Sequence, residues 1–242
     1  MKYLAGLMFA LLMMSVTGFS QDNYLDMKFG VGIPVGDFSN KELETTGYAG
    51  PGFMMSFEGN YFLGVIGFSG SLTYGMNFLD DVALQNDITQ HLQELFPDVE
   101  LPPDAKTQFV ISQWSNVNAL VGPVLSLPVV PALRVEVKAM GGVSFVMPPT
   151  WQLYIQTGDG QLHSESYGQS VKGAYLLGAG ITYKSSGTYG IHLGMDYVGS
   201  KTNFKLNYAF IEGDVENPPY QTKTVKIPVN MIQVNLGITY AF

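Results

Sequence analysis

Cysteine is absent from this chain of 242 residues. A disulfide framework and a thiolate metal site are therefore excluded, and so is a lipid anchor on an N-terminal cysteine. Charged residues are also few, at 13% of the sequence against 46% hydrophobic residues, whereas soluble domains carry about 25% charged residues. The chain thus has an excess of apolar over charged residues that its fold must accommodate.

Long apolar runs are missing from most of the sequence as well. The best candidate, residues 119–133, contains Pro123, Pro128 and Pro131, and three prolines at that spacing break a helix. Without such a helix, the other structure that satisfies every backbone polar group in lipid is a closed barrel. Basic residues are not clustered, which argues against a nucleic-acid partner.

The N-terminus holds the one uninterrupted apolar run. Lys2 precedes an almost wholly apolar stretch, and Gly18 and Ser20 place small residues before Gln21. This pattern predicts a cleavable secretory signal peptide over residues 1–20. The alternative is a retained anchor helix, but the run is shorter than the roughly 20 apolar residues that a spanning helix needs. Residues 21–242 then form a single domain.

Apolar residues alternate with polar or very small residues along much of the chain, which is typical of β-strands. The last strand, residues 232–242, is the clearest, with Leu236, Ile238, Tyr240 and Phe242 on its apolar face. Strands with the same pattern are predicted at 24–33, 53–60, 66–76, 109–125, 133–145, 173–184 and 189–197. The count is therefore eight, with ten as an alternative.

A soluble sandwich also alternates, but three features favour a transmembrane barrel. Aromatic residues such as Tyr74, Tyr197 and Tyr240 stand at the ends of the apolar faces, as in interfacial girdles. The polar faces are rich in Gly, Ser and Thr, which suits a narrow lumen. Predicted connections alternate between short turns (59–62, 126–131, 184–187) and long loops (34–51, 77–108, 147–172, 199–226), as in outer-membrane barrels with short periplasmic turns and longer extracellular loops.

The chain resembles the small outer-membrane β-barrel proteins, the OmpA-like and OmpX-like barrels, particularly the versions found in the Bacteroidota. The matching segments are GVGIPVGDF at residues 30–38, VGP at 121–123 and GITYAF at 237–242. The resemblance implies an all-β, closed, up-and-down barrel in the bacterial outer membrane, in contact with its lipids. It also implies that the final strand, through Leu236, Ile238, Tyr240 and Phe242, is read by the outer-membrane assembly machinery. The alternative is that Phe242 only anchors the barrel at the interface.

Charged residues on the polar faces are predicted to lie in the periplasmic half of the lumen. An eight-stranded barrel has an interior just wide enough for side chains to fill, and an unpaired buried charge costs several kcal/mol. We therefore expect an internal salt-bridge network that plugs the lumen. The alternative is that these residues line a narrow water-filled passage. The predicted set is Asp26, Lys28, Glu58, Arg134, Glu136, Lys138, His192 and Asp196.

The second long loop has a helical pattern. Ile88, Leu92, Leu95 and Phe96 share one helix face, and Pro97 ends the helix. The segment is acidic, with Asp80, Asp81, Asp87, Glu94, Asp98, Glu100 and Asp104 against Lys106. The apolar face either folds over the barrel mouth or docks another envelope protein.

The fourth long loop continues the strand pattern with a change of phase. Phe204, Leu206 and Tyr208 alternate at even positions, whereas 191–197 alternate at odd ones, and a similar switch precedes Ile232. A one-residue phase change is what a β-bulge produces. We therefore predict two bulged strands that extend past the membrane as a protruding hairpin.

No catalytic, cofactor-binding or metal-binding set is predicted. His163, Ser164 and Glu165 are adjacent, but neighbours on an extended chain point apart and rarely assemble the base and nucleophile that catalysis needs. Three function classes remain: a structural or partner-binding envelope barrel, a narrow porin-like channel for small solutes, and an accessory of a secretion or assembly complex.

Overall fold

The computed structural model describes residues 23–43, 45–99, 107–157, 160–184, 187–211 and 220–242. The predicted signal peptide lies outside these residues, as do Glu100, Asp104 and Lys106 of the acidic loop. No helix in the described part is long and apolar enough to cross a membrane.

Eight antiparallel strands form a closed ring. Each strand pairs with its neighbours along the chain, and the last strand closes on the first, with Tyr24 opposite Ala241. The prediction of an all-β, up-and-down barrel of eight strands is therefore confirmed, and the alternative of ten is wrong. The ring consists of β1 (Tyr24–Pro34), β2 (Ala49–Leu63), β3 (Ile66–Leu79), β5 (Trp114–Val130), β6 (Leu133–Met147), β9 (Ser170–Tyr183), β10 (Tyr189–Ile211) and β11 (Gln221–Ala241).

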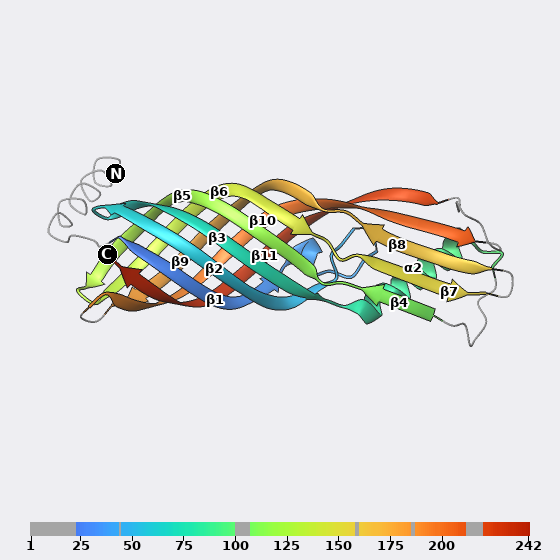
Figure 1. The fold of residues 1–242 in the computed structure, drawn as a ribbon, viewed down its shortest axis with the longest axis horizontal. Coiled ribbons are helices and arrows are strands. Elements are labelled where there is room, and N and C mark those ends of the chain that lie inside the picture. The colour runs from blue at the N-terminus through green and yellow to red at the C-terminus, as the bar shows by residue number, and fades with distance from the viewer. Residues whose placement is uncertain (1–22, 44, 100–106, 158–159, 185–186, 212–219) are drawn as a thin grey trace, which may run out of the picture.

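The two ends of the barrel differ. Short turns lie at the end that also holds the C-terminus, here the turn end, and the long connections gather at the other, the loop end (Figure 1). The first turn is centred on Gly64, whose φ of +72° favours glycine. The predicted turn at 59–62 was placed too early, because β2 and β3 stay paired as far as Leu63 and Ile66. Long and short connections alternate as predicted.

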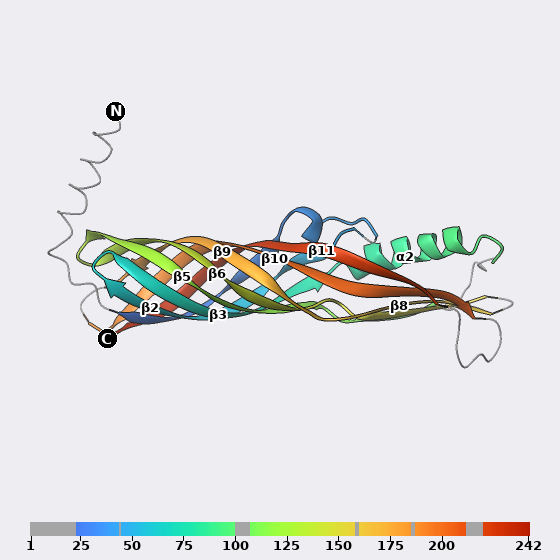
Figure 2. The ribbon, with the colours of Figure 1, turned by 90° about the horizontal axis from the view of Figure 1, so that it is seen from above.

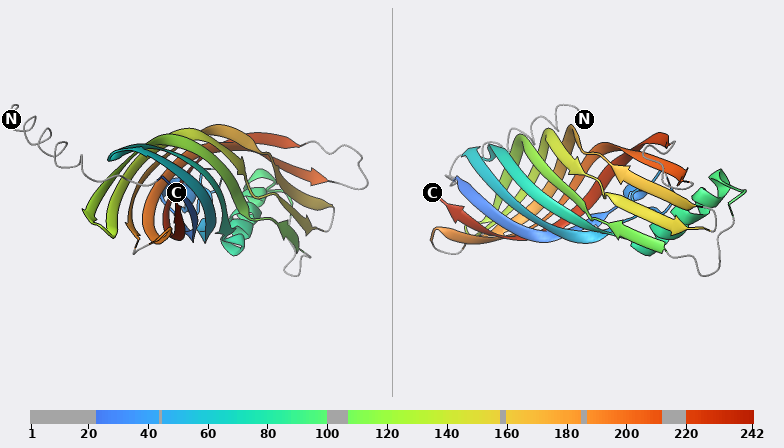
Figure 3. Two further views of the ribbon diagram at one scale, coloured as in Figure 1. Left: turned by 60° about the vertical axis from the view of Figure 1, so that its left-hand side comes forward. Right: turned by 45° about the vertical axis from the view of Figure 1, so that its right-hand side comes forward.

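A second structure extends the wall at the loop end. Three short strands add to the upper part of β10, which is the part beyond the barrel at the loop end. They are, in order, β8 (Gln161–Tyr167), β7 (Trp151–Gln156) and β4 (Thr107–Ile111). Together with the upper parts of β10 and β11 they make an open sheet that continues one side of the barrel (Figure 3). The helix α2 (Asp81–Leu95) runs beside this sheet, and the short helix η1 (Gly36–Phe38) lies near its base (Figure 2). We call this assembly the cap.

The cap corrects one strand prediction. Residues 109–125 are not one barrel strand, because the chain leaves strand structure at Ser112 and Gln113. The first part belongs to β4 and pairs with β7, whereas the second belongs to β5 and pairs with β3 and β6.

The long hairpin β10–β11 confirms the predicted protrusion but not the predicted bulges. Its register is continuous from the pair Tyr189–Tyr240 to the pair Tyr208–Gln221. The same side of β10 that carries His192 and Asp196 into the barrel carries Phe204 and Leu206 into the cap, and all four are buried. The change of phase in the sequence therefore reflects a change of surroundings, and no residue is inserted.

Candidate functional site: the barrel interior and the cap

Three buried charges form the centre of the lumen. Glu58 on β2 lies between two ammonium groups, with Lys138 Nζ at 2.6 Å and Lys28 Nζ at 2.9 Å from its Oε2 atom. Lys138 lies on β6, which β3 and β5 separate from β2, so its ion pair with Glu58 reaches across the lumen, whereas Lys28 lies on the neighbouring strand β1. The two ion pairs place both cations on the same carboxylate.

Two further carboxylates complete this cluster. Asp196 on β10 lies 3.3 Å from Lys138 and accepts a hydrogen bond from Asn235 at 3.0 Å. Asp26 on β1 lies 3.5 Å from Lys28 and accepts a 2.6 Å hydrogen bond from the Thr239 hydroxyl. Each lysine therefore contacts two carboxylates.

A second group lies beside the cluster and contains the lumen histidine. His192 Nδ1 is 3.8 Å from Glu136 and 3.0 Å from the Thr182 hydroxyl, which donates to Glu136 at 3.3 Å. Arg134 lies closer to the turn end, with its guanidinium 5.2 Å from the ring centroid of Tyr24, within cation–π range. The structure thus joins the predicted residues in two neighbouring groups and places Arg134 against an aromatic ring that the sequence analysis did not select.

These eight side chains are closed off from solvent. Every one has 8% or less of its surface exposed. Towards the loop end, the inward residues are uncharged but polar, and include Ser56, Thr73, Asn116 and Asn118. Thr73 donates to Ser56 at 2.9 Å, and Asn118 donates to Asn116 at 2.9 Å. Side chains therefore fill the barrel interior at successive levels.

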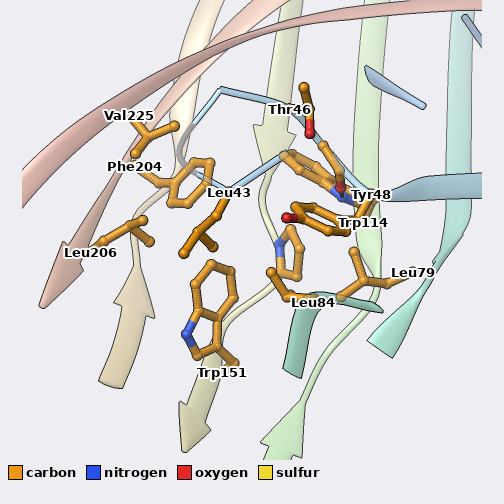
Figure 4. A pocket seen from close by; sticks show the side chains of 12 residues that line it. Leu43, Thr46, Tyr48, Leu79, Leu84, Trp114, Trp151, Phe204, Leu206 and Val225 are labelled. Atoms are coloured by element: carbon orange, nitrogen blue, oxygen red, sulfur yellow. Dashed lines mark hydrogen bonds between the residues drawn. The ribbon is translucent and has the colours of Figure 1, made fainter. Parts of the chain in front are cut away.

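The interior becomes apolar where the barrel meets the cap. Trp114 packs edge-on against Phe38 and Phe204, and its indole N–H donates to the Gly47 carbonyl at 2.7 Å. Trp151 also packs edge-on against Phe204. Both tryptophans of the chain therefore lie in this core. Figure 4 shows the small pocket that they border, which has a volume of about 10 Å³ and is lined by Leu43, Thr46, Gly47, Tyr48, Leu79, Leu84, Trp114, Pro149, Trp151, Phe204, Leu206 and Val225.

Polar contacts hold α2 in the cap. The Asp80 side chain accepts from the Ala83 amide at 3.0 Å and lies 2.5 Å from Lys41 Nζ. The hydrogen bond from Lys41 and the one from Ala83 lower the pKa of Asp80. Further along, the Tyr48 hydroxyl donates to Asp87, and burial raises the pKa of Tyr48. Asp80 thus serves as the N-cap of α2 and ties it to the first long loop.

The apolar face of α2 is covered by the chain itself. Ile88 and Leu92 have 0% exposure, and Leu95 and Phe96 pack partly buried against the same core, with Phe96 6.3 Å from Phe210 between ring centroids. In the folded cap this face is occupied by the chain's own core, and its docking of another envelope protein stays a prediction. The helix also runs along the cap sheet, so it does not lie flat across the barrel mouth (Figure 2).

The outer wall of the barrel carries an apolar belt between two rows of aromatic side chains. Tyr189 and Tyr240 lie 5.5 Å apart at the turn end, and Tyr175 and Tyr197 lie 6.1 Å apart at the loop end, between ring centroids. Eight residues separate Tyr189 from Tyr197, or about 26 Å along the strand. The belt between them is exposed and includes Leu25, Met27, Phe29, Val31, Phe57, Leu72, Val121, Val137, Val143, Leu177, Ile181, Ile191, Leu193, Met195, Val234, Leu236 and Ile238.

The predicted assembly signal lies on this wall. Leu236, Ile238, Tyr240 and Phe242 are exposed on the outer face at the end of the chain, and β11 forms the closing seam with β1. Recognition by an assembly receptor stays a prediction.

The cap sheet separates Ser164 from its neighbours His163 and Glu165, which lie on the opposite face. Ser164 faces the cap core and lies 3.4 Å from the indole nitrogen of Trp151. His163 lies on the opposite face, stacked on Tyr154 and 2.9 Å from the Tyr220 hydroxyl, and burial lowers its pKa. The three therefore cannot act as one catalytic set. Within the described ranges, no three His, Asp or Glu residues are placed to hold a metal ion.

Comparisons with known proteins identify similar folds at low sequence identity. Neisserial surface protein A is 12% identical over 91% of this chain and 97% of its own, with a TM-score of 0.41. A major outer membrane protein from Thermus thermophilus is 13% identical over 92% of this chain and all of its own, with a TM-score of 0.48. The attachment invasion locus protein Ail of Yersinia pestis is 11% identical over 91% of this chain and all of its own, with a TM-score of 0.39.

No protein-family model matches the chain, and no curated protein matches it in sequence. The structural likenesses are too distant to assign a role, so the fold rests on the strand pairing described above.

Proposed function

We propose that this chain is an integral protein of the bacterial outer membrane. The observation that carries the proposal is the inverted distribution of polarity in the barrel. Its charged residues are buried inside, whereas its large apolar residues are exposed outside, between two aromatic rows. Water on the outside would leave that belt unfavourably solvated, whereas lipid matches its chemistry. With a strand tilt of roughly 40° the belt is about 20 Å high, close to the apolar band of about 25 Å on outer-membrane barrels. The turn end then faces the periplasm and the cap faces outward.

We further propose that the barrel does not conduct solutes. The ion pair of Glu58 with Lys138 crosses the lumen, Lys28 lies against the same carboxylate, and the apolar cap core continues from the outer end of the lumen. A water-filled passage would solvate the charged groups, yet they are almost completely buried. The proposed role is therefore structural or partner-binding, without catalysis, and is exercised through the cap.

Two experiments test these proposals. The purified chain should need detergent to stay in solution and should migrate differently in gels before and after boiling, because a folded barrel resists the detergent of the gel. Solubility without detergent and identical migration would contradict membrane insertion. Single-channel recording in planar bilayers should then show no steady conductance. A large, steady current would instead favour the porin-like channel.

Co-purification from native outer membranes examines the partner-binding role. An accessory of a secretion or assembly complex should bring partners in fixed stoichiometry, whereas a self-contained envelope barrel should be recovered alone. Replacement of the cap segment 148–169, which contains β7 and β8, by a short turn should abolish any such partner and leave the barrel heat-modifiable. Retention of the partner would place its binding surface elsewhere.

A further inference from the structure

Lysines are concentrated on one side of the loop end. Five of the twelve basic residues of the chain lie on the consecutive strands β9, β10 and β11, in their parts nearest the cap. They are Lys172, Lys201, Lys205, Lys223 and Lys226. The chain as a whole has a net charge of −8, so this concentration runs against its overall sign.

Three of these lysines continue the outer face of the barrel wall. Lys201 and Lys205 share the outward side of β10 with Tyr197, and Lys226 is opposite Asn203, which lies between them on the same side. All three lysines are exposed. They therefore form one strip on the outside of the hairpin, here the basic strip, while the opposite side of the hairpin packs into the cap core.

The height of the basic strip places it beside the membrane surface. Lys201 follows the aromatic residue Tyr197 by four residues, about 13 Å along a strand. With a strand tilt of roughly 40°, that is about 10 Å above the aromatic row. The headgroup region begins just beyond such a row, where amphipathic rings sit at the boundary of the apolar core. Lys201 thus lies at headgroup level, and Lys205 and Lys226 lie farther out.

We propose that the basic strip binds the phosphate groups of outer-leaflet lipids. This inference rests on the proposed membrane placement and adds a ligand chemistry to it. Ammonium groups in a row on a rigid hairpin can each contact a phosphate, and lipids diffusing around the barrel bring phosphates to that level. A soluble polyanion would have no reason to require a strip that begins at the edge of the apolar belt.

Two residues of β8 lie beside the basic strip on this face. The Lys205 ammonium nitrogen lies 5.9 Å from the ring centroid of Tyr167, a cation–π contact that leaves its charge in place. Glu165 shares this face; it is opposite Asn207 and accepts its hydrogen bond at 2.8 Å. Glu165 is therefore farther from the membrane than Lys205 and engaged with an amide.

The test measures binding of bisphosphorylated lipid A to the folded protein in detergent by native mass spectrometry. The double variant Lys201→Gln/Lys226→Gln should bind roughly thirtyfold more weakly, since each basic residue near an anionic surface contributes about fivefold. The matched control Lys41→Gln/Lys184→Gln removes the same charge elsewhere and should bind as the wild type does. Dephosphorylated lipid A and inorganic phosphate should both bind poorly to all forms.

Equal weakening by the control pair, or unchanged binding by the double variant, would overturn the proposal. Equally tight binding of inorganic phosphate would show a general anion site rather than a lipid site. Heat-modifiability of each variant is measured first. If the wild-type chain inserts into bilayers but does not bind lipid A, only this inference is refuted. If the chain does not insert, the proposed function is refuted.

Discussion

The two halves of the β10–β11 hairpin have the same backbone and opposite chemistry. In the lower half, nearer the turn end, Leu193 and Met195 are exposed and His192 and Asp196 are buried. In the upper half, Leu206 and Ile227 are buried, while Lys205 and Lys226 are exposed. The register between the two strands does not change. One continuous ribbon therefore passes from an inside-out arrangement to that of an ordinary water-soluble protein.

The comparison shows that surroundings decide which side of a strand is apolar. Alternation records only that two faces differ. Where lipid is outside and a narrow lumen inside, the apolar side must face out. Where water is outside and α2 covers the inner side, the apolar side must face in. The crossover falls between Tyr197 and Lys201, which we take as the level of the membrane surface.

The largest loss of barrel stability is expected when a buried charge in the lumen of the lower half is removed. Glu58→Gln removes the carboxylate shared by Lys28 and Lys138. We expect a loss of about 3–5 kcal/mol in barrel stability, because two ammonium groups are left buried with less compensation. Denaturant titration of the heat-modifiable band in vesicles measures the loss.

Two further variants identify the cause. Adding Lys138→Met to Glu58→Gln should lower the stability further, because Asp196 then also loses the lysine that lies 3.3 Å from it. Glu94→Gln, on the exposed side of α2, should change stability by no more than about 0.5 kcal/mol. Equal effects of Glu58→Gln and Glu94→Gln would show that the lumen charges are hydrated.

A single substitution on the outward side of β10 sharpens the contrast between the halves. Leu193→Arg places a charge in the apolar belt and should cost about 2–4 kcal/mol. Asn203→Arg, on the same side of the same strand but in the cap, should stay within about 0.5 kcal/mol. Similar costs at the two positions would mean that both face the same solvent.

The sequence predicted the barrel better than the cap. Strand number, loop asymmetry and the inward charges followed from alternation in segments whose surroundings are uniform along their length. The cap strands β4, β7 and β8 were missed. β7 and β8 form a local hairpin, but the pairings that join them to β10 and to β4 are distant in sequence. β4 alternates like a barrel strand, and only its pairing with β7 shows otherwise. The occurrence of both tryptophans at loop ends, at Trp114 and Trp151, was the available signal of a second core.

The smallest expected effect concerns the cap alone. Asp80→Ala removes the N-cap of α2 and its contact with Lys41, and should cost the cap about 1 kcal/mol. Tryptophan fluorescence follows this change, because both tryptophans lie in the cap core. Barrel heat-modifiability should be unaffected. A barrel that loosens together with the cap would show one cooperative unit.

The pH dependence of this effect has a definite sign. Because the pKa of Asp80 is lower in the folded chain, its contribution is present above the unfolded pKa of about 4. It is lost as the pH falls through the folded pKa. Wild type and Asp80→Ala should therefore differ at neutral pH and converge in acid. A difference that persists in strong acid would assign the effect to something other than the carboxylate.

The central claim, that one unbroken outer face passes from lipid to water, is tested most directly by spin labels along β10. The chain has no cysteine, so single cysteines at positions 191, 193, 195, 197, 201, 203 and 205 can each carry a nitroxide in reconstituted bilayers. The account predicts collisions with dissolved oxygen up to 197 and with a water-soluble nickel complex from 201 onward. Exposure of 193 to the nickel complex, or burial of 201–205 with their even-numbered neighbours exposed instead, would contradict it.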